Sequence, residues 1–175
     1  MPVPKYALSE FERRFLVLAD VTELVDGNYV AIDDLYVTGA RLRLRRIRPS
    51  TGGPETFKLC KKYGDTAAGG DGIVNIYLTA DEHALLGCLP GQPITKRRYH
   101  RVWNDIRYPL DIFAGDLAGL ILTEVEAADA MRLRAVQAPP WAYAEVTDDE
   151  WFRGGNLATQ SADALAIRLR QATQS

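Results

Sequence analysis

Short runs of alternating hydrophobic and polar residues dominate this chain, and turn-forming residues separate them. Successive side chains of a strand point to opposite faces, so such runs predict half-buried strands. In the first run, over residues 10–18, Glu10, Glu12 and Arg14 fall on one face. Aromatic and aliphatic side chains fall on the other. We therefore predict a strand with one apolar and one strongly charged face.

Seven more segments read as strands, and few read as helices. The strands are predicted at residues 28–38, 41–47, 57–63, 73–78, 94–102, 108–113 and 119–127. A helix is predicted from 80 to 86, with Thr79 and Glu82 forming a capping box, and a second at about 161–171. Residues 64–72, rich in Gly, Asp and Ala, are predicted to be a loop. Eight short strands with few helices indicate a mainly β (α+β) antiparallel barrel or sandwich, and we expect residues 1–175 to form one domain.

Composition narrows the classes of partner. A formal net charge of −2 provides no overall basic field, so we expect no nucleic acid. No apolar run approaches the roughly 20 residues that span a bilayer, so no membrane partner is expected. Cys60 and Cys88 form no CxxC pair, and the N-terminus lacks the apolar core of a signal peptide. We expect a cytoplasmic protein, with a homodimer left open.

The polar faces of the predicted strands carry like charges that are grouped strand by strand, whereas protein surfaces usually mix signs. The cations are Arg41, Arg43, Arg45, Lys58, Lys62, Lys96 and Arg98, and the acids beyond residues 10 and 12 are Asp111, Glu124 and Glu126. A polyanion would offset the cations, and a divalent metal would offset the acids. Carboxylates for metal and cations for phosphate are the components of phosphoryl transfer. The alternative is a barrel whose charges are solvated or pair among themselves.

These runs, in order and spacing, resemble the CYTH, or triphosphate tunnel metalloenzyme, superfamily. The resemblance starts with an ExExK-like signature at residues 10–17 and continues through 41–45, 96–99, 111–115, 119–126 and 156–158. It implies a closed, eight-stranded antiparallel barrel with a charged interior and peripheral helices. It also implies Mg²⁺- or Mn²⁺-dependent hydrolysis of inorganic triphosphate, thiamine triphosphate or RNA 5′-triphosphate ends, or cyclisation of ATP.

The resemblance assigns roles by matching position. It implies metal ligands at Glu10, Glu12, Glu124 and Glu126, with Asp111 either at the metal or paired to a cation. It implies triphosphate binding by Arg41, Arg43, Lys62, Lys96 and Arg98, to which the alternation adds Lys58. The catalytic set would be Glu10, Glu12, Arg14, Glu124 and Glu126, with a carboxylate of the last pair accepting a proton from the attacking water.

The chain departs from the family pattern in three places. Arg14 stands where the signature has lysine, residues 72–78 hold no acid, and Pro109 stands where a glutamate is common. Our leading hypothesis is a hydrolase of small triphosphate-containing molecules, foremost inorganic triphosphate. The alternatives are an adenylate cyclase or a thiamine triphosphatase of the same fold, and a non-catalytic binder of polyphosphate or nucleotides.

Overall fold

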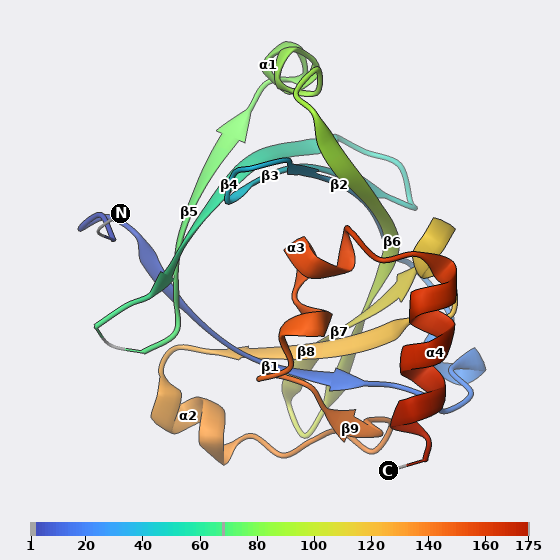
Figure 1. The fold of residues 1–175 in the computed structure, drawn as a ribbon. Coiled ribbons are helices and arrows are strands. Elements are labelled where there is room, and N and C mark those ends of the chain that lie inside the picture. Colours follow the sequence, from blue (N-terminus) through green and yellow to red (C-terminus); the bar gives the residue numbers. More distant parts are fainter. Residues whose placement is uncertain (1–2, 68, 175) are drawn as a thin grey trace.

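A closed antiparallel β-barrel forms the body of the protein in the computed structural model, which describes residues 3–67 and 69–174 (Figure 1). Its strands are β1 (Leu8–Leu16), β2 (Val30–Val37), β3 (Leu42–Pro49), β4 (Thr56–Asp65), β5 (Asp71–Leu78), β6 (Gly91–Trp103), β7 (Ile106–Phe113), β8 (Ile121–Ala127) and the short β9 (Ala144–Glu145). The order is β5-β4-β3-β2-β6-β7-β8-β1-β9. An additional pairing of β5 with β1 closes the first eight strands into a ring, as the sequence predicts.

Helices lie on the outside and at one end of the ring. They are α1 (Ala80–Leu86), α2 (Ala130–Ala135), α3 (Gly154–Leu157) and α4 (Ala162–Ala172), with 3-10 turns η1 (Thr22–Leu24), η2 (Gly115–Leu117) and η3 (Glu150–Phe152). The predicted capping box of α1 is present, and Ser161 caps α4, which matches the expected C-terminal helix. In Figure 1, α4 lies beside the barrel, whereas α3 lies within the outline of the ring. Among the described residues, no helix has the length and apolarity needed to cross a membrane.

The connection between β4 and β5 is shorter than the sequence predicts. A loop was predicted over residues 64–72, but β4 extends to Asp65 and β5 starts at Asp71. The strands remain paired across a register shift between Lys62 and Gly64, where Gly64 has a φ of 88°. Glycine allows this irregularity because it has no Cβ to clash at positive φ. The correction moves Asp71 from a loop into the wall of the barrel.

Pro109 belongs to β7, which lies between β6 and β8, so it is not on an edge strand. It pairs with His100 of β6, and the ladder to β8 begins one residue later, at Leu110. Pro109 therefore lies outside the ladder that β7 forms with β8. The hydroxyl of Thr123 on β8 donates instead to the carbonyl of Pro109 at 3.0 Å.

The interior changes character along the barrel. Outside the ring, buried residues such as Phe15, Tyr108 and Val125 pack under the segments that cover the barrel. Inside the ring, the inward-facing residues of a strand form a row, and the rows that carry charged side chains end in apolar side chains. One such row is Glu12, Arg14, Leu16, because alternate residues share a face. The interior is thus charged in its middle and apolar at one end.

Candidate active site

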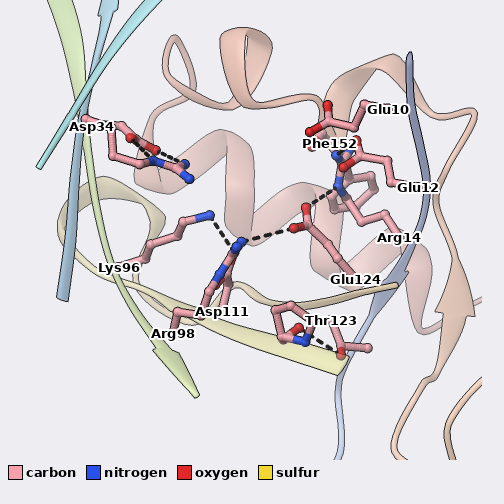
Figure 2. Close-up of polar contacts among 12 residues, drawn as sticks. Glu10, Glu12, Arg14, Asp34, Lys96, Arg98, Asp111, Thr123, Glu124 and Phe152 are labelled. Carbon is pink, nitrogen blue, oxygen red and sulfur yellow. Dashed lines mark hydrogen bonds and ion pairs between the residues drawn. The ribbon is translucent and has the colours of Figure 1, made fainter. Parts of the chain in front are cut away.

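The charged rows predicted from the sequence converge inside the barrel. Figure 2 shows side chains from β1, β2, β6, β7 and β8 pointing toward one another: Glu10, Glu12, Arg14, Asp34, Lys96, Arg98, Asp111 and Glu124. Arg14 lies directly opposite Glu124 in the β1–β8 ladder, and Arg98 lies opposite Asp111 in the β6–β7 ladder. Strand alternation and register therefore place acids beside cations across neighbouring strands.

Glu124 and Asp111 are surrounded by cations. Glu124 accepts hydrogen bonds from Arg14 Nε at 3.0 Å and from Arg98 Nη2 at 3.0 Å, one on each carboxylate oxygen. Asp111, which is 1% exposed, accepts two from Arg98 at 2.6 Å each and one from Lys96. Burial alone would raise the pKa of both carboxyls, but the neighbouring cations outweigh it and hold each pKa below its usual range. Both acids are therefore ionised, and each of their carboxylate oxygens accepts a hydrogen bond from Arg or Lys.

Asp34 of β2 belongs to the same cluster, and sequence reasoning did not select it. Its two oxygens accept hydrogen bonds from Arg45 at 2.6 and 2.7 Å, and Arg43 Nε lies 3.8 Å away. Burial would raise its pKa, yet Arg45 and Arg43 lower it overall. A signal was present in the alternation, because Asp34 falls between Ile32 and Tyr36 on the inward face while Asp33 faces outward to Arg48.

Arg14 is a buried junction. Its Nε donates to Glu124, its Nη2 donates to Glu12 Oε1 at 2.5 Å, and its Nη1 donates to the main-chain carbonyl of Phe152 at 3.2 Å. Only 8% of the residue is exposed. Burial would lower the pKa of Arg14, but Glu124 and Glu12 raise it further than burial lowers it. This guanidinium stays charged and is bonded on three sides by the protein.

Glu10, Glu12 and Glu126 differ from the deeper acids. Glu10 accepts one hydrogen bond from Lys62 Nζ at 2.6 Å, and Glu126 has no hydrogen bond or ion pair among the described residues. Glu126 lies directly opposite Glu12 in the ladder, so the two carboxylates share one face of adjacent strands. Burial and Glu124 raise the pKa of Glu12, and burial together with Glu10 raises the pKa of Glu126. Repulsion among these acids is only partly offset by protein cations.

The remaining predicted cations lie on β3 and β4. Lys62 Nζ contacts Glu10 Oε2 and lies 3.5 Å from Asp71 Oδ2. Asp71 is the acid that the sequence prediction assigned to a loop. Arg43 has a buried Nε without a hydrogen-bond partner among the described residues. Lys58 Nζ lies 4.8 Å from the centroid of the Tyr77 ring. Arg41 is exposed and donates to the carbonyl of Tyr63, so the structure places it outside the charged cluster.

The acids differ in how well they suit a divalent metal. No group of three or more His, Cys, Asp or Glu side chains in the described part of the chain is arranged as a complete metal site. Mg²⁺, however, usually takes only one or two protein carboxylates and completes its shell with water and phosphate oxygens. Glu10 and Glu12 each keep an oxygen without a hydrogen bond from protein. They fit such a cation, whereas Asp111 and Glu124 have no oxygen to spare.

A closed antiparallel barrel with acids and cations facing inward is the architecture of a triphosphate tunnel protein, and the chain belongs to this CYTH-like family. It is similar to an inorganic triphosphatase of Nitrosomonas europaea, with 32% identity over 158 residues. That alignment covers 86% of this chain and 97% of the relative. No protein-family profile matches the sequence.

Solved structures show the same fold. The inorganic triphosphatase NE1496 superposes with a TM-score of 0.56 at 26% identity, over 87% of this chain and 96% of that protein. A Bacillus halodurans protein described as a candidate adenylate cyclase superposes with a TM-score of 0.52, over 82% of this chain and 98% of its own. Its identity of 14% supports the fold alone. The predicted eight-stranded barrel and the family resemblance are confirmed.

Proposed function

We propose that the protein is a divalent-metal-dependent hydrolase that cleaves inorganic triphosphate to pyrophosphate and phosphate. The observation that carries the proposal is that acids and cations with incomplete hydrogen bonding lie inside the same barrel. Glu12 and Glu126 lie opposite one another on β1 and β8, and burial together with Glu124 and Glu10 raises the pKa of each, while Arg43 keeps a buried Nε without a hydrogen-bond partner among the described residues. The related triphosphatase of Nitrosomonas europaea agrees with this chemistry.

Triphosphate binding is assigned first to the cations of β3 and β4. Arg43 offers an Nε without a hydrogen-bond partner among the described residues, and Lys62 and Lys58 lie on the same face of β4. Lys96 and Arg98 line the cluster from β6, where Asp111 fixes their positions. An Arg fork donates two parallel hydrogen bonds to phosphate, and a Lys supplies a compact charge.

Glu10 and Glu12 would hold Mg²⁺ or Mn²⁺ through the oxygens that no protein donor occupies. When bound, the metal would neutralise phosphate oxygens and lower the pKa of a coordinated water. Of the pair at 124 and 126, Glu126 is the better acceptor for a proton from water, because its pKa is raised and it accepts no hydrogen bond among the described residues. Glu124, ionised and bonded twice, would position Arg14 and Arg98.

The direct test is release of phosphate from tripolyphosphate with added Mg²⁺ or Mn²⁺. We expect Glu12→Gln and Arg43→Ala to reduce release strongly. Arg46→Ala is a matched control, because Arg46 is on the outward face of the same strand and pairs with Glu55. Absence of metal-dependent release from tripolyphosphate, thiamine triphosphate and ATP would contradict the hydrolase. Formation of cyclic AMP from ATP would indicate a cyclase instead.

A non-catalytic polyphosphate or nucleotide binder is the second candidate. The observation that favours it is Arg14, which stands in place of the signature lysine and whose donors are directed to Glu12, Glu124 and Phe152. Tight binding of tripolyphosphate without turnover would support this reading. For either function we propose a cytoplasmic location, which suits two free cysteines.

A further inference from the structure

The hairpin formed by β6 and β7 extends beyond both of its neighbouring strands. β6 pairs with β2 only as far as Arg98, and β7 pairs with β8 only from Leu110 onward. Between these positions the two strands pair with each other, around a turn in which Asn104 and Asp105 have φ values of 50° and 59°. Positive φ at both turn residues matches the twist of a two-stranded ribbon. We call residues 99–109 the overhanging hairpin.

The outer face of the overhanging hairpin is anchored to the rest of the protein. Tyr108 is fully buried in an apolar cluster against which Trp103 packs. Arg101 donates hydrogen bonds at 2.5 Å to the main-chain carbonyls of Leu24 and Asp26. The hairpin is therefore held in place, although its tip lies beyond the strands on either side.

The inner face of the overhanging hairpin continues the row of Arg98. His100 and Val102 follow at alternate positions of β6, and Arg107 lies opposite Val102 on β7. All three residues are exposed. On the other side of Arg98, the row leads back to Ile94 in the buried apolar cluster. The inner face of the hairpin thus lies toward the end of the barrel away from that cluster.

Positive charge accumulates on this inner face. Partial burial lowers the pKa of His100, and repulsion by Arg107 and Arg98 lowers it further. The side chain of Arg107 forms no hydrogen bond or ion pair with the described residues. If the register of β7 and β8 continued, Glu126 would lie opposite Arg107, yet no ion pair joins the two side chains. Arg107 is therefore available to bind an anionic ligand.

We propose that Arg107 and His100 form an additional anion subsite, which binds the fourth phosphoryl group of a linear polyphosphate. The inference rests on the proposed function, because the first three phosphoryl groups occupy the triphosphate site that ends at Arg98. Arg107 presents a planar fork of donors, and a neutral His100 can donate one further hydrogen bond to a phosphate oxygen. Triphosphate leaves this subsite empty, so polyphosphates of four or more phosphoryl groups bind more tightly.

The chemistry of the inner face favours a phosphoryl group over a nucleoside. Proteins commonly hold bases by stacking them on aromatic rings. The aromatic residues Tyr99, Trp103 and Tyr108 all pack on the outer face of the hairpin. Within the overhanging hairpin, the imidazole of His100 is the one ring on the inner face. The cationic group is therefore the main binding group that this face offers.

Calorimetry with tripolyphosphate and tetrapolyphosphate tests the subsite, without divalent metal so that no metal-dependent turnover occurs. We expect the wild type to bind tetrapolyphosphate at least about tenfold more tightly than tripolyphosphate. Arg107→Gln should abolish this difference and leave tripolyphosphate affinity unchanged within about twofold. His100→Ala should reduce the difference in part. Arg97→Gln is the matched control, because Arg97 is exposed on the outer face of β6 and lies over the ring of Tyr29, and it should change neither affinity.

Several results would overturn the subsite. They are equal affinity of the wild type for both chain lengths, equal losses for both in Arg107→Gln, and a length-selective loss in Arg97→Gln. Loss of ATP affinity in Arg107→Gln, with tetrapolyphosphate affinity unchanged, would assign Arg107 to a nucleotide instead. Weaker Mn²⁺ binding in Arg107→Gln, with both polyphosphate affinities unchanged, would assign it to Glu126.

The same variants separate this inference from the proposed hydrolase. Length-selective binding that Arg107→Gln abolishes, without hydrolysis of tripolyphosphate when Mg²⁺ or Mn²⁺ is added, would support the subsite and contradict the hydrolase. Hydrolysis of tripolyphosphate without any effect of chain length on binding would contradict the subsite alone. Absence of binding of either polyphosphate by the wild type would contradict both.

Discussion

Two groups of carboxylates share the inside of one barrel, and they differ in what surrounds them. Asp34, Asp111 and Glu124 have both oxygens bonded to Arg or Lys, and the pKa of each is lowered despite burial. Glu12 and Glu126 face one another, and the pKa of each is raised. The first group fixes the positions of cations, and the second keeps carboxylate oxygens that accept no hydrogen bond among the described residues.

This difference shows that the role of a charged residue cannot be assigned from its face of the strand alone, because the role depends on the partners of its side chain. The sequence treats Glu124 and Glu126 as an equivalent pair, because they occupy the same face two residues apart. The structure gives Glu124 hydrogen bonds from two arginines and gives Glu126 no hydrogen bond among the described residues. The following predictions test the division, from the largest expected effect to the smallest.

Asp33 and Asp34 provide the strongest contrast, because they are adjacent and face opposite sides of β2. Asp34→Ala would leave Arg45 and Arg43 without their buried acid, which typically costs about 3–5 kcal/mol of unfolding free energy. Asp33→Ala removes a partly exposed pair with Arg48 and should cost less than about 1 kcal/mol. Urea unfolding of both variants measures the difference, and similar losses would contradict the division.

Acid titration should separate the two groups by sign. The lowered pKa values of Asp34, Asp111 and Glu124 mean that the unfolded chain binds more protons below about pH 4, so stability is lost as pH falls through that range. The raised pKa values of Glu12 and Glu126 act oppositely, because the folded state takes up protons first as pH falls.

We therefore expect little change or a small gain in stability down to about pH 5, followed by a steep loss below pH 4. Glu124→Gln should reduce that loss by on the order of 2 kcal/mol, because one acid with a lowered pKa is gone. The exposed Glu23→Gln variant is the control. A pH profile for Glu124→Gln parallel to that of the wild type would contradict this account.

Metal affinity should depend on the acids that protein cations leave partly free. Glu12→Gln should weaken Mn²⁺ binding at least about tenfold, or about 1.4 kcal/mol, because it removes a carboxylate with an unbonded oxygen. Arg13→Gln, on the outward face of the same strand, should leave Mn²⁺ affinity unchanged. Electron paramagnetic resonance of Mn²⁺ gives a direct readout, and equal affinity of wild type and Glu12→Gln would remove Glu12 from the metal site.

Lys58 should give the smallest effect. Its ammonium lies over the exposed ring of Tyr77, and such cation–π contacts contribute about 0.5–1 kcal/mol at exposed sites. Lys58→Gln should change unfolding free energy by less than about 1 kcal/mol. It should also weaken tripolyphosphate binding less than Lys62→Gln, whose ammonium lies against Glu10 inside the barrel. Calorimetry on the two variants ranks them, and a larger loss at Lys58 would contradict this order.

The alternation of residues predicted the strands and which residues share a face, and the family resemblance predicted that the charged faces point into a barrel. Asp34 was missed although the alternation carried a signal, and Asp71 was assigned to a loop because of the Gly-rich composition around it. Alternation cannot predict register between distant strands, which places Asp71 beside Glu10. Nor could it predict that the row ending in Leu16 would meet Phe152, because that contact joins β1 to a segment more than a hundred residues away. Long-range pairing, which decides which acids are neutralised, is absent from a local pattern.

The ring is closed by only a short ladder, in which Leu8, Ser9 and Glu10 of β1 pair with Ile73, Gly72 and Asp71 of β5. A barrel has no exposed strand edges while this ladder holds, and edges invite pairing with other chains. Local opening should begin at this joint, since β1 and β5 contact each other less extensively than any other neighbouring pair of the eight strands. Lys62 of β4 already bridges it by contacting both Glu10 and Asp71. A ligand that strengthens this bridge would raise the thermal stability of the barrel and protect it against aggregation at the same time.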